Sequence, residues 1–168
     1  MSLRKGMLSP LFGLLFFILL LSGCSSTENS ATSHYYLSLM GESQTWNLIG
    51  YEVMITPEDL KVGNGTLHMK NEDEYIAEFF RFRTHAVING EDTVLQSSSV
   101  AGNGINIAQD TTGSVESRGY VNNQGDAIRL HEINEIYMVV EWWDLDESER
   151  NSERIELYND NKGSSFLN

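Results

Sequence analysis

From residue 34 onward, apolar side chains alternate with polar ones along short runs rich in Val, Ile, Tyr, Phe and Trp. Alternation with a period of two is typical of β-strands, whose successive side chains point to opposite faces, and it differs from the 3.6-residue period of a helix. The clearest runs are residues 35–39, 46–55, 66–69, 75–82, 85–88, 93–96, 105–108, 114–121, 127–130, 136–143 and 154–158. The pattern therefore predicts an all-β domain.

Turn residues lie between many of these runs. Asn64-Gly65, Asn89-Gly90 and Asn103-Gly104 combine two residues that accept a positive φ, and Asn123-Gln124-Gly125-Asp126 separates two further apolar runs. Such spacing predicts hairpins and therefore two packed antiparallel sheets, an immunoglobulin-like or jelly-roll-like β-sandwich. A closed barrel is the alternative that the pattern leaves open.

One segment carries helix signals instead. Thr56 can cap a helix, Pro57 suits its first position, and Asp59 can complete a weak capping box. We expect a short helix from Thr56 that ends before Gly63.

The first 23 residues differ from the rest. Arg4 and Lys5 precede an apolar run from Met7 to Leu21 that is interrupted only by Ser9, Pro10 and Gly13. A membrane-spanning helix needs about 20 continuous apolar residues. The shorter run after a basic start predicts a cleaved signal helix, residues 1–23.

The end of this run specifies the kind of signal. Leu21-Ser22-Gly23-Cys24 resembles the lipobox of bacterial lipoproteins. The resemblance implies cleavage before Cys24, a diacylglyceryl group on its thiol and, as an option, an acyl chain on the new N-terminus. It also implies a lipid-anchored protein on the outer face of the bacterial cell membrane, with no other cofactor.

The mature chain divides into three parts. Residues 24–33 are small or polar and predict a flexible tether, residues 34–160 form the β-domain, and residues 161–168 are expected to be a disordered tail. Without Arg4 and Lys5, nine of the 11 basic residues remain against 24 acidic ones, a net charge of −15. This charge argues against nucleic acid as a partner. With Cys24 as the one cysteine, no internal disulfide can form, and we expect a monomeric domain with an ordinary hydrophobic core.

Two stretches of the domain support a wider resemblance. They are Gly41-Glu42-Ser43-Gln44-Thr45-Trp46 and Val140-Glu141-Trp142, the latter followed by Glu153-Arg154-Ile155-Glu156-Leu157. Together they resemble small, uncharacterised surface lipoproteins of Gram-positive bacteria, a group in which the acidic stretch at residues 144–153 is usually a short turn. The resemblance implies an extracytoplasmic β-sandwich and supplies no catalytic residues.

Motifs for catalysis are weak. Asp110-Thr111-Thr112-Gly113-Ser114 resembles an aspartic protease loop, but an extra threonine separates the carboxylate from the glycine. The chain has no Gly-x-Ser-x-Gly elbow and no zinc-type spacing among its four histidines. We therefore expect a protein that is not an enzyme, with an unrecognised cell-envelope hydrolase as an alternative.

The run at 136–143 is a candidate binding surface. Ile136, Met138, Val140 and Trp142 share one face, while Tyr137, Val139 and Trp143 make the other face apolar as well. Either the fold covers both faces, or an aromatic patch that includes Tyr137, Trp142 and Trp143 is exposed for an envelope protein or polymer. The sequence thus indicates a binding or interaction domain whose ligand it does not identify.

The acidic stretch after this run gives the second candidate. Asp144, Asp146, Glu147 and Glu149 place four carboxylates within six residues, and calcium binds six to eight oxygen ligands. The EF-hand register fails because Glu149 stands where that loop requires glycine. Residues 144–153 are therefore either a solvated hairpin tip or the site of a calcium-responsive binding module.

Overall fold

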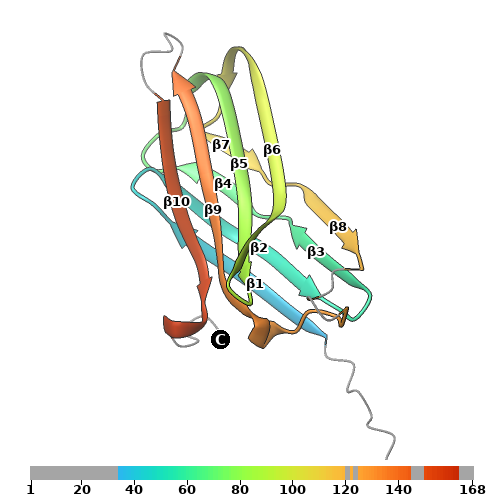
Figure 1. Cartoon of the computed structure of the whole chain (residues 1–168). Helices are drawn as coiled ribbons and strands as arrows, with labels where there is room; N and C mark the ends of the chain where they lie inside the picture. Colours follow the sequence, from blue (N-terminus) through green and yellow to red (C-terminus); the bar gives the residue numbers. More distant parts are fainter. Residues whose placement is uncertain (1–33, 120–121, 123–124, 145–149, 163–168) are drawn as a thin grey trace, which may run out of the picture. The chain divides into compact units, whose positions relative to one another are not determined.

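The computed structural model describes residues 34–119, 122, 125–144 and 150–162 (Figure 1). These residues belong to one compact unit. The strands are β1 (Tyr35–Glu42), β2 (Trp46–Ile55), β3 (Asp59–Gly63), β4 (Thr66–Met69), β5 (Ile76–Ile88), β6 (Glu91–Asn106), β7 (Gln109–Thr111), β8 (Ser114–Arg118), β9 (Ile133–Asp144) and β10 (Arg150–Asn159). Two short 3-10 helices, η1 (Leu130–Glu132) and η2 (Asp160–Lys162), complete the described elements. The predicted all-β class is confirmed.

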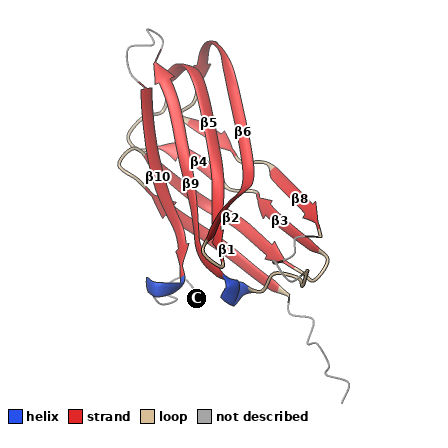
Figure 2. Ribbon diagram, viewed as in Figure 1, coloured by secondary structure: helices blue, strands red, loops and turns tan. Residues whose placement is uncertain are grey.

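The strands form two antiparallel sheets that pack face to face (Figure 2). Sheet A contains β1 to β4, β7 and β8, and sheet B has the order β10-β9-β5-β6. Each sheet keeps its own two edges, so the domain is the expected sandwich and not the closed barrel. Strand β1, at one edge of sheet A, contacts β10, at one edge of sheet B.

Sheet A is more regular than its strand count suggests. Along β2, Ile55 faces Leu60 of β3 and Trp46 faces Met69 of β4, so β3 and β4 keep one register and act as a single interrupted row. Strands β8 and β7 form a second interrupted row beside it. Hydrogen bonds continue across the interruption, from the Asn64 N–H to the Gly113 carbonyl at 2.6 Å and from the Thr112 N–H to the Gly65 carbonyl at 2.9 Å.

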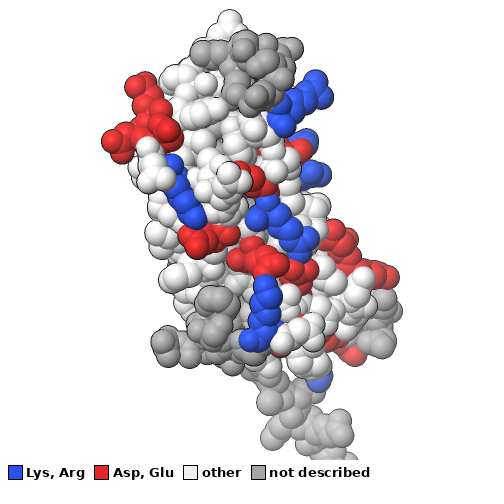
Figure 3. Space-filling model, turned by 90° about the vertical axis from the view of Figure 1, so that its left-hand side faces the viewer, with Lys and Arg blue, Asp and Glu red and all other residues white. Residues whose placement is uncertain are grey.

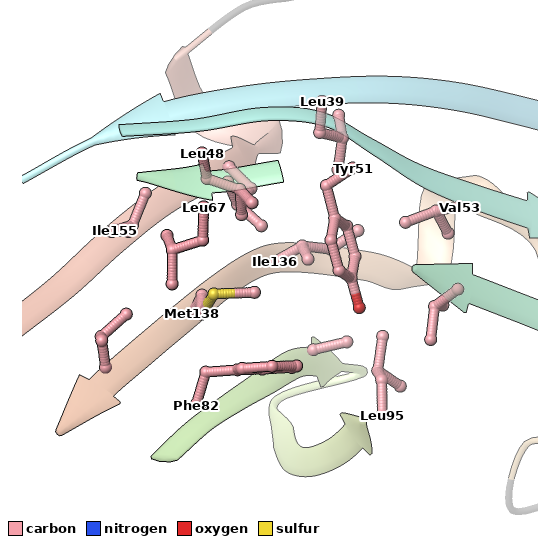
Figure 4. Packing of buried hydrophobic residues seen from close by; sticks show 14 of the residues in the cluster. Leu39, Leu48, Tyr51, Val53, Leu67, Phe82, Leu95, Ile136, Met138 and Ile155 are labelled. Carbon is pink, nitrogen blue, oxygen red and sulfur yellow. The ribbon is translucent and has the colours of Figure 1, made fainter. Parts of the chain in front are cut away.

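The core lies between the two sheets. Its largest fully buried side chains come from both layers (Figure 4) and are Trp46, Leu48, Tyr51, Val53, Leu67, Phe80, Phe82, Ile107, Ile136, Met138, Ile155 and Leu157. Trp46 packs against Phe80 and Trp142 with ring centroids 5.6 and 5.5 Å apart. Burial of these aromatic and aliphatic side chains supplies the main stabilisation of a chain whose one cysteine cannot form an internal disulfide.

A short polar chain crosses this core. The Tyr51 hydroxyl reaches from sheet A toward sheet B (Figure 4) and donates a hydrogen bond to Gln96 Oε1 at 2.8 Å. The Gln96 side-chain amide donates to the Thr112 carbonyl at 2.6 Å, and the Thr112 hydroxyl accepts from the Gly65 N–H at 2.9 Å. The side chains of Tyr51, Gln96 and Thr112 thus each find a hydrogen-bond partner, as a low-dielectric interior requires.

The turn predictions have different outcomes. Asn89-Gly90 forms the β5–β6 hairpin with φ values of 52° and 83°, as predicted. Asn103-Gly104, predicted as a hairpin turn, lies inside β6 instead, where the register against β5 shifts between Ala77 and Phe79. Positive φ at Gly104 serves a β-bulge there, because β5 extends past this point and keeps β6 in the sheet.

The predicted helix at Thr56 is wrong. The Thr56 hydroxyl does cap a turn, accepting from the Asp59 N–H at 2.9 Å, but the chain then enters β3 at Asp59. Leu60 and Val62 of β3 are buried against the core, at 6% and 2% exposure. Pairing with β2 and β8 therefore overrides the local helix signals.

Other strand boundaries also moved. The runs at 75–82 and 85–88 are one strand, β5. The run at 93–96 and the first two residues of the run at 105–108 are joined by residues 97–104 into β6, which ends at Asn106. Residues 127–130 form no strand beyond a single bridge position. The short strands β3 and β7 were not predicted.

The two ends of the sandwich differ in what they carry (Figure 1). The start of β1, the β5–β6 hairpin, η1 and η2 lie at one end, and the facing ends of β9 and β10 lie at the other. A chain attached through residues preceding β1 is therefore held by the first end.

Candidate functional site

An open groove lies on the side of the sandwich where the edges of the two sheets meet. We call it the β1–β10 groove. It has a volume of about 490 Å³ and is lined by Met40, Gly41, Glu42, Asn47, Leu48, Ile49, Glu156, Leu157, Tyr158, Asn159 and Lys162. Met40 and Ile49 are 58% and 51% exposed, so the groove presents two large apolar side chains to solvent.

Irregularities in three strands form this groove. The β1–β2 register shifts between Leu39 and Gly41, and Gly50 of β2 has φ = 68°. The β10–β9 register shifts between Glu156 and Tyr158. Bulges bend strands and redirect side chains, and they recur beside binding sites. Here they turn Met40 and Ile49 outward above the buried side chains of Leu48 and Leu157.

The resemblance motif at residues 41–46 holds one wall of the groove. Gly41 passes against β10 so closely that no side chain fits there. The Ser43 hydroxyl accepts from the Trp46 N–H at 3.1 Å and tightens the β1–β2 turn, and Trp46 enters the core. Lys70 bridges to the Glu42 carboxylate at 2.7 Å. Gly41, Glu42, Ser43 and Trp46 thus each have a structural role beside the groove.

Glu153 ties this turn to β10. Its carboxylate accepts from the Thr45 N–H at 2.9 Å and from the Thr45 hydroxyl at 2.6 Å. Partial burial raises the pKa of Glu153, but hydrogen bonds from Ser43 and Thr45 and the nearby Lys70 charge lower it below its ordinary value overall. Glu153 is therefore a structural carboxylate that stays ionised near neutral pH.

Charges around the groove are paired. Lys162 forms an ion pair with Glu156 and holds the pKa of that carboxyl below its ordinary value, as Lys70 does for Glu42. Figure 3, which looks onto the side of the domain that carries β10, shows acidic and basic side chains next to one another. The groove therefore offers an apolar surface bordered by paired positive and negative charges, and its border has no excess of either sign.

The predicted aromatic residues do not form one exposed patch. Trp142 points into the core at 4% exposure, so a ligand cannot reach it without opening the sandwich. Tyr137 faces outward, but the His85 ring stacks on it at 4.8 Å and the Arg154 guanidinium lies 3.5 Å from its ring centroid. Its hydroxyl donates to Asp92 at 2.8 Å. Long side chains of β5 and β10 thus cover Tyr137.

Trp143 is the more accessible member of the three. It is half-buried and stacks on Phe79 with ring centroids 3.7 Å apart, and the Arg150 guanidinium lies 5.2 Å from the centroid of its ring. Glu141, between these clusters, pairs with Arg81 at 2.7 Å and Arg83 at 3.2 Å. The outer face of sheet B is therefore a self-paired layer of aromatic and charged side chains.

The acidic stretch is described only at its two ends. Asp144 closes β9, while Asp146, Glu147 and Glu149 lie outside the described residues. Within the described part of the chain, no group of three or more His, Cys, Asp or Glu side chains converges as a metal site would require. The aspartic-protease-like stretch is structural: Thr112 is buried, and Gly113, with φ = 60°, links β7 to β8.

The lipidation motif also falls outside the described residues, which begin at His34. This applies to Leu21, Ser22, Gly23 and Cys24, to the signal helix and to the tether. None of the helices in the described ranges has the length and apolar character to span a membrane.

Comparison of the chain with protein-family models, curated proteins and solved structures gave no match.

Sequence reasoning missed the groove. Ile49 belongs to a run that was predicted as an ordinary strand, and Met40 directly follows another. In the run before Met40, Leu37 and Leu39 point to the core, so Met40 occupies a position that is expected to face solvent. An apolar residue in the solvent phase of an edge strand was the available signal. The contribution of Leu157 and Lys162 depends on the meeting of β1 with β10, which no local pattern encodes.

Proposed function

We propose that this chain is a lipid-anchored binding module on the outer face of the bacterial cell membrane, and that the β1–β10 groove receives an apolar segment of an envelope protein. The lipobox from Leu21 to Cys24 supports the anchor. The exposure of Met40 and Ile49 on the groove carries the binding part of the proposal. A non-enzymatic role agrees with charged groups that are paired for structure around the groove.

The chemistry of the groove favours one kind of occupant. Its walls offer thioether and aliphatic surface, and its volume of about 490 Å³ suits a few bulky side chains. Methionine adapts its shape to varied apolar partners, which is useful at a binding surface. The paired Glu156 and Lys162 at the rim give a charged ligand no net attraction.

Photocrosslinking in the native envelope tests this function. A benzophenone amino acid at Ile49 of the lipidated chain should form a covalent adduct with one envelope protein. Met40→Asp should abolish that adduct, because a carboxylate in the groove must lose its hydration when an apolar segment enters. Met54→Asp is the matched control, since Met54 is 42% exposed on β2 but does not line the groove.

A direct measurement completes the test. The purified partner should bind the purified full chain, and Met40→Asp should weaken this binding while Met54→Asp should not. Adducts that persist in Met40→Asp, or that form equally from position 54, would show that the groove is not the binding site.

A further inference from the structure

Strand β6 forms the edge of sheet B on the side of the sandwich opposite the groove. It is 16 residues long, and no strand among the described residues pairs with its outer edge. As far as the described strands go, its backbone N–H and C=O groups along that edge are therefore available to pair with another extended chain. Natural proteins usually protect such an edge with charges, prolines or a cover.

Beyond Glu91 and Asp92 at its start, the sequence of β6 has no such charge or proline. No Asp, Glu, Lys, Arg or Pro occurs from Thr93 to Gln109, although charged residues make up 21% of the chain. By contrast, β10 carries Arg150, Glu153, Arg154 and Glu156, and β8 carries Glu116 and Arg118. The edge strand β7 is three residues long and includes Asp110, and the edge strand β1 is packed against β10 at Gly41.

The geometry of β6 limits the pairing segment to its middle. Register shifts against β5 occur near Leu95 and again between Ala101 and Ile105. Between them, Gln96 to Ala101 pair regularly with β5, and Ser97 to Ala101 are all exposed. Bulges end a regular ladder, so these six residues are the part of the edge that can accept a further strand.

An inward-facing side chain on this segment is also left uncovered. Val100 is opposite Phe80, which is 2% exposed, so both point to the inner face of sheet B. Val100 nevertheless keeps 42% exposure. Val115 on β8, at the adjacent edge of sheet A, is opposite the buried Val62 and keeps 39% exposure. The sandwich thus ends on this side with apolar inner surface that an added strand would cover.

We propose that the Gln96–Ala101 edge of β6 is a second interaction surface, which binds an extended, uncharged segment of another envelope protein by strand addition to sheet B. Main-chain hydrogen bonds would supply the affinity and alternate side chains the specificity. The segment places small or polar side chains beside Ser97 and Ser99 and apolar ones beside Val100.

A second copy of this chain suits the edge less well. Antiparallel pairing of two β6 strands would put the two β1 starts at opposite ends of a 16-residue strand, about 50 Å apart. A tether from Cys24 to His34 spans at most about 35 Å. If both copies are anchored to one membrane as proposed, and the paired strands stand upright on that membrane, the tether of the inverted copy is too short to reach the membrane.

A synthetic peptide tests strand addition. The probe is the acetylated and amidated peptide Ser-Val-Thr-Val-Thr-Val-Ser with a fluorophore, added to the full lipidated chain in phosphatidylcholine vesicles. We expect saturable binding below 1 mM by fluorescence anisotropy, and slower amide hydrogen exchange at alternate residues of 96–101. Two N-methylated peptides, with methyl groups on the odd or on the even amides, test for strand addition. In an added strand only alternate N–H groups face β6, so one of the two peptides should fail to bind and the other should still bind.

Two substitutions locate the surface. Val100→Lys puts a charge against the apolar side of the added strand and should weaken peptide binding at least about tenfold. Val94→Lys is the matched control, since Val94 lies on β6 at 47% exposure but outside the pairing segment and on the outer face. Binding of both N-methylated peptides, equal loss in both variants or no binding at 1 mM would overturn the proposal. So would protection of 96–101 without peptide that depends on protein density, because a second copy would then occupy the edge.

Discussion

Gly41 of β1 lies so close to Glu156 of β10 that a Cβ atom at position 41 would sit 2.3 Å from the Glu156 carbonyl oxygen. The same atom would meet a methyl group of Ile155 at 2.8 Å. The two sheets therefore approach each other at this edge because position 41 has no side chain. Gly41 and Glu156 also both line the β1–β10 groove.

Gly41→Ala should push β1 away from β10 and lower the free energy of unfolding by about 1–3 kcal/mol. Gly102→Ala is the control, because a Cβ there meets no atom within 4 Å. That change should be neutral or slightly stabilising, by about 0.4–1 kcal/mol, since it removes freedom from the unfolded chain. Urea unfolding of both variants decides, and equal destabilisation would contradict the close approach.

Alkaline pH should reveal the buried Tyr51 hydroxyl. Burial raises its pKa to about 12 from 10.0, so the unfolded chain releases this proton at lower pH than the folded protein. The associated stability is complete below pH 10 and is lost as pH rises from 10 to 12. The difference between these two pKa values corresponds to about 3 kcal/mol in the free energy of unfolding. We expect the parent to lose that much more stability across this range than Tyr51→Phe does.

Tyr36→Phe provides the comparison for Tyr51→Phe. Tyr36 is 56% exposed and its pKa is raised through a hydrogen bond to Glu52. Its removal should change the alkaline slope less than removal of Tyr51. Parallel stability curves for the parent and Tyr51→Phe between pH 10 and 12 would refute the buried hydroxyl.

Acidic pH should expose the role of Glu153. The pKa of Glu153 is lower in the folded protein than its ordinary value of 4.5. Its contribution to the free energy of unfolding is therefore present above pH 4.5 and is lost as pH falls through the pKa of the folded state. Glu153→Gln should therefore be less stable than the parent at pH 7 and show a shallower loss on acidification. Thermal melts between pH 2.5 and 7 measure this, with the exposed Glu72→Gln as control. Identical acid slopes would assign Glu153 no such role.

Cys24→Ala should abolish lipid attachment. In proteins with a lipobox, the cysteine sulfur atom receives the diacylglyceryl group, and alanine has no sulfur. We expect no incorporation of a clickable fatty acid and an accumulation of unprocessed precursor in the membrane. Labelling equal to that of the parent would remove the basis for the anchor.

Calcium is expected to leave the melting temperature of the chain unchanged relative to EDTA at matched ionic strength. Glu153, the last carboxylate of residues 144–153, is already bound to Thr45. A filled site at a hundredfold excess over Kd would add about 2.7 kcal/mol. A rise in melting temperature with calcium in the parent, absent from an Asp144→Asn, Asp146→Asn variant, would instead establish the calcium-responsive module.

The fold class followed from local pattern because alternation is set by the sheet itself. Ile136, Met138 and Val140 share one face of β9, as the alternation indicated, and all three are fully buried. The errors arose where distant strands decide. Leu60 joins a strand because β2 and β8 flank it, and residues 97–104 extend β6 because β5 continues beside them.

The candidate sites were harder to predict than the fold. Tyr137 and Trp142 occupy odd and even positions of β9, so their side chains point to opposite faces of the sheet. The aromatic run therefore cannot act as one surface. Coverage of Tyr137 depends on His85 and Arg154, which are far from it in sequence. Likewise, the groove exists only because β1 meets β10, a contact between the two ends of the domain.

The interrupted rows of sheet A restrict how the length of this chain can vary. Gly50, Asn64 and Gly113 all have positive φ and lie where the matched segments of their rows meet. Because one register runs through each interruption, the gain or loss of a single residue at Asn64 would move Leu67 and Met69 from the core to solvent. It would also break their alignment with β2 and β7 together. Natural insertions and deletions in sheet A should therefore be confined to its outer loops. The number of residues at the interruption around Gly50, Asn64 and Gly113 should stay fixed.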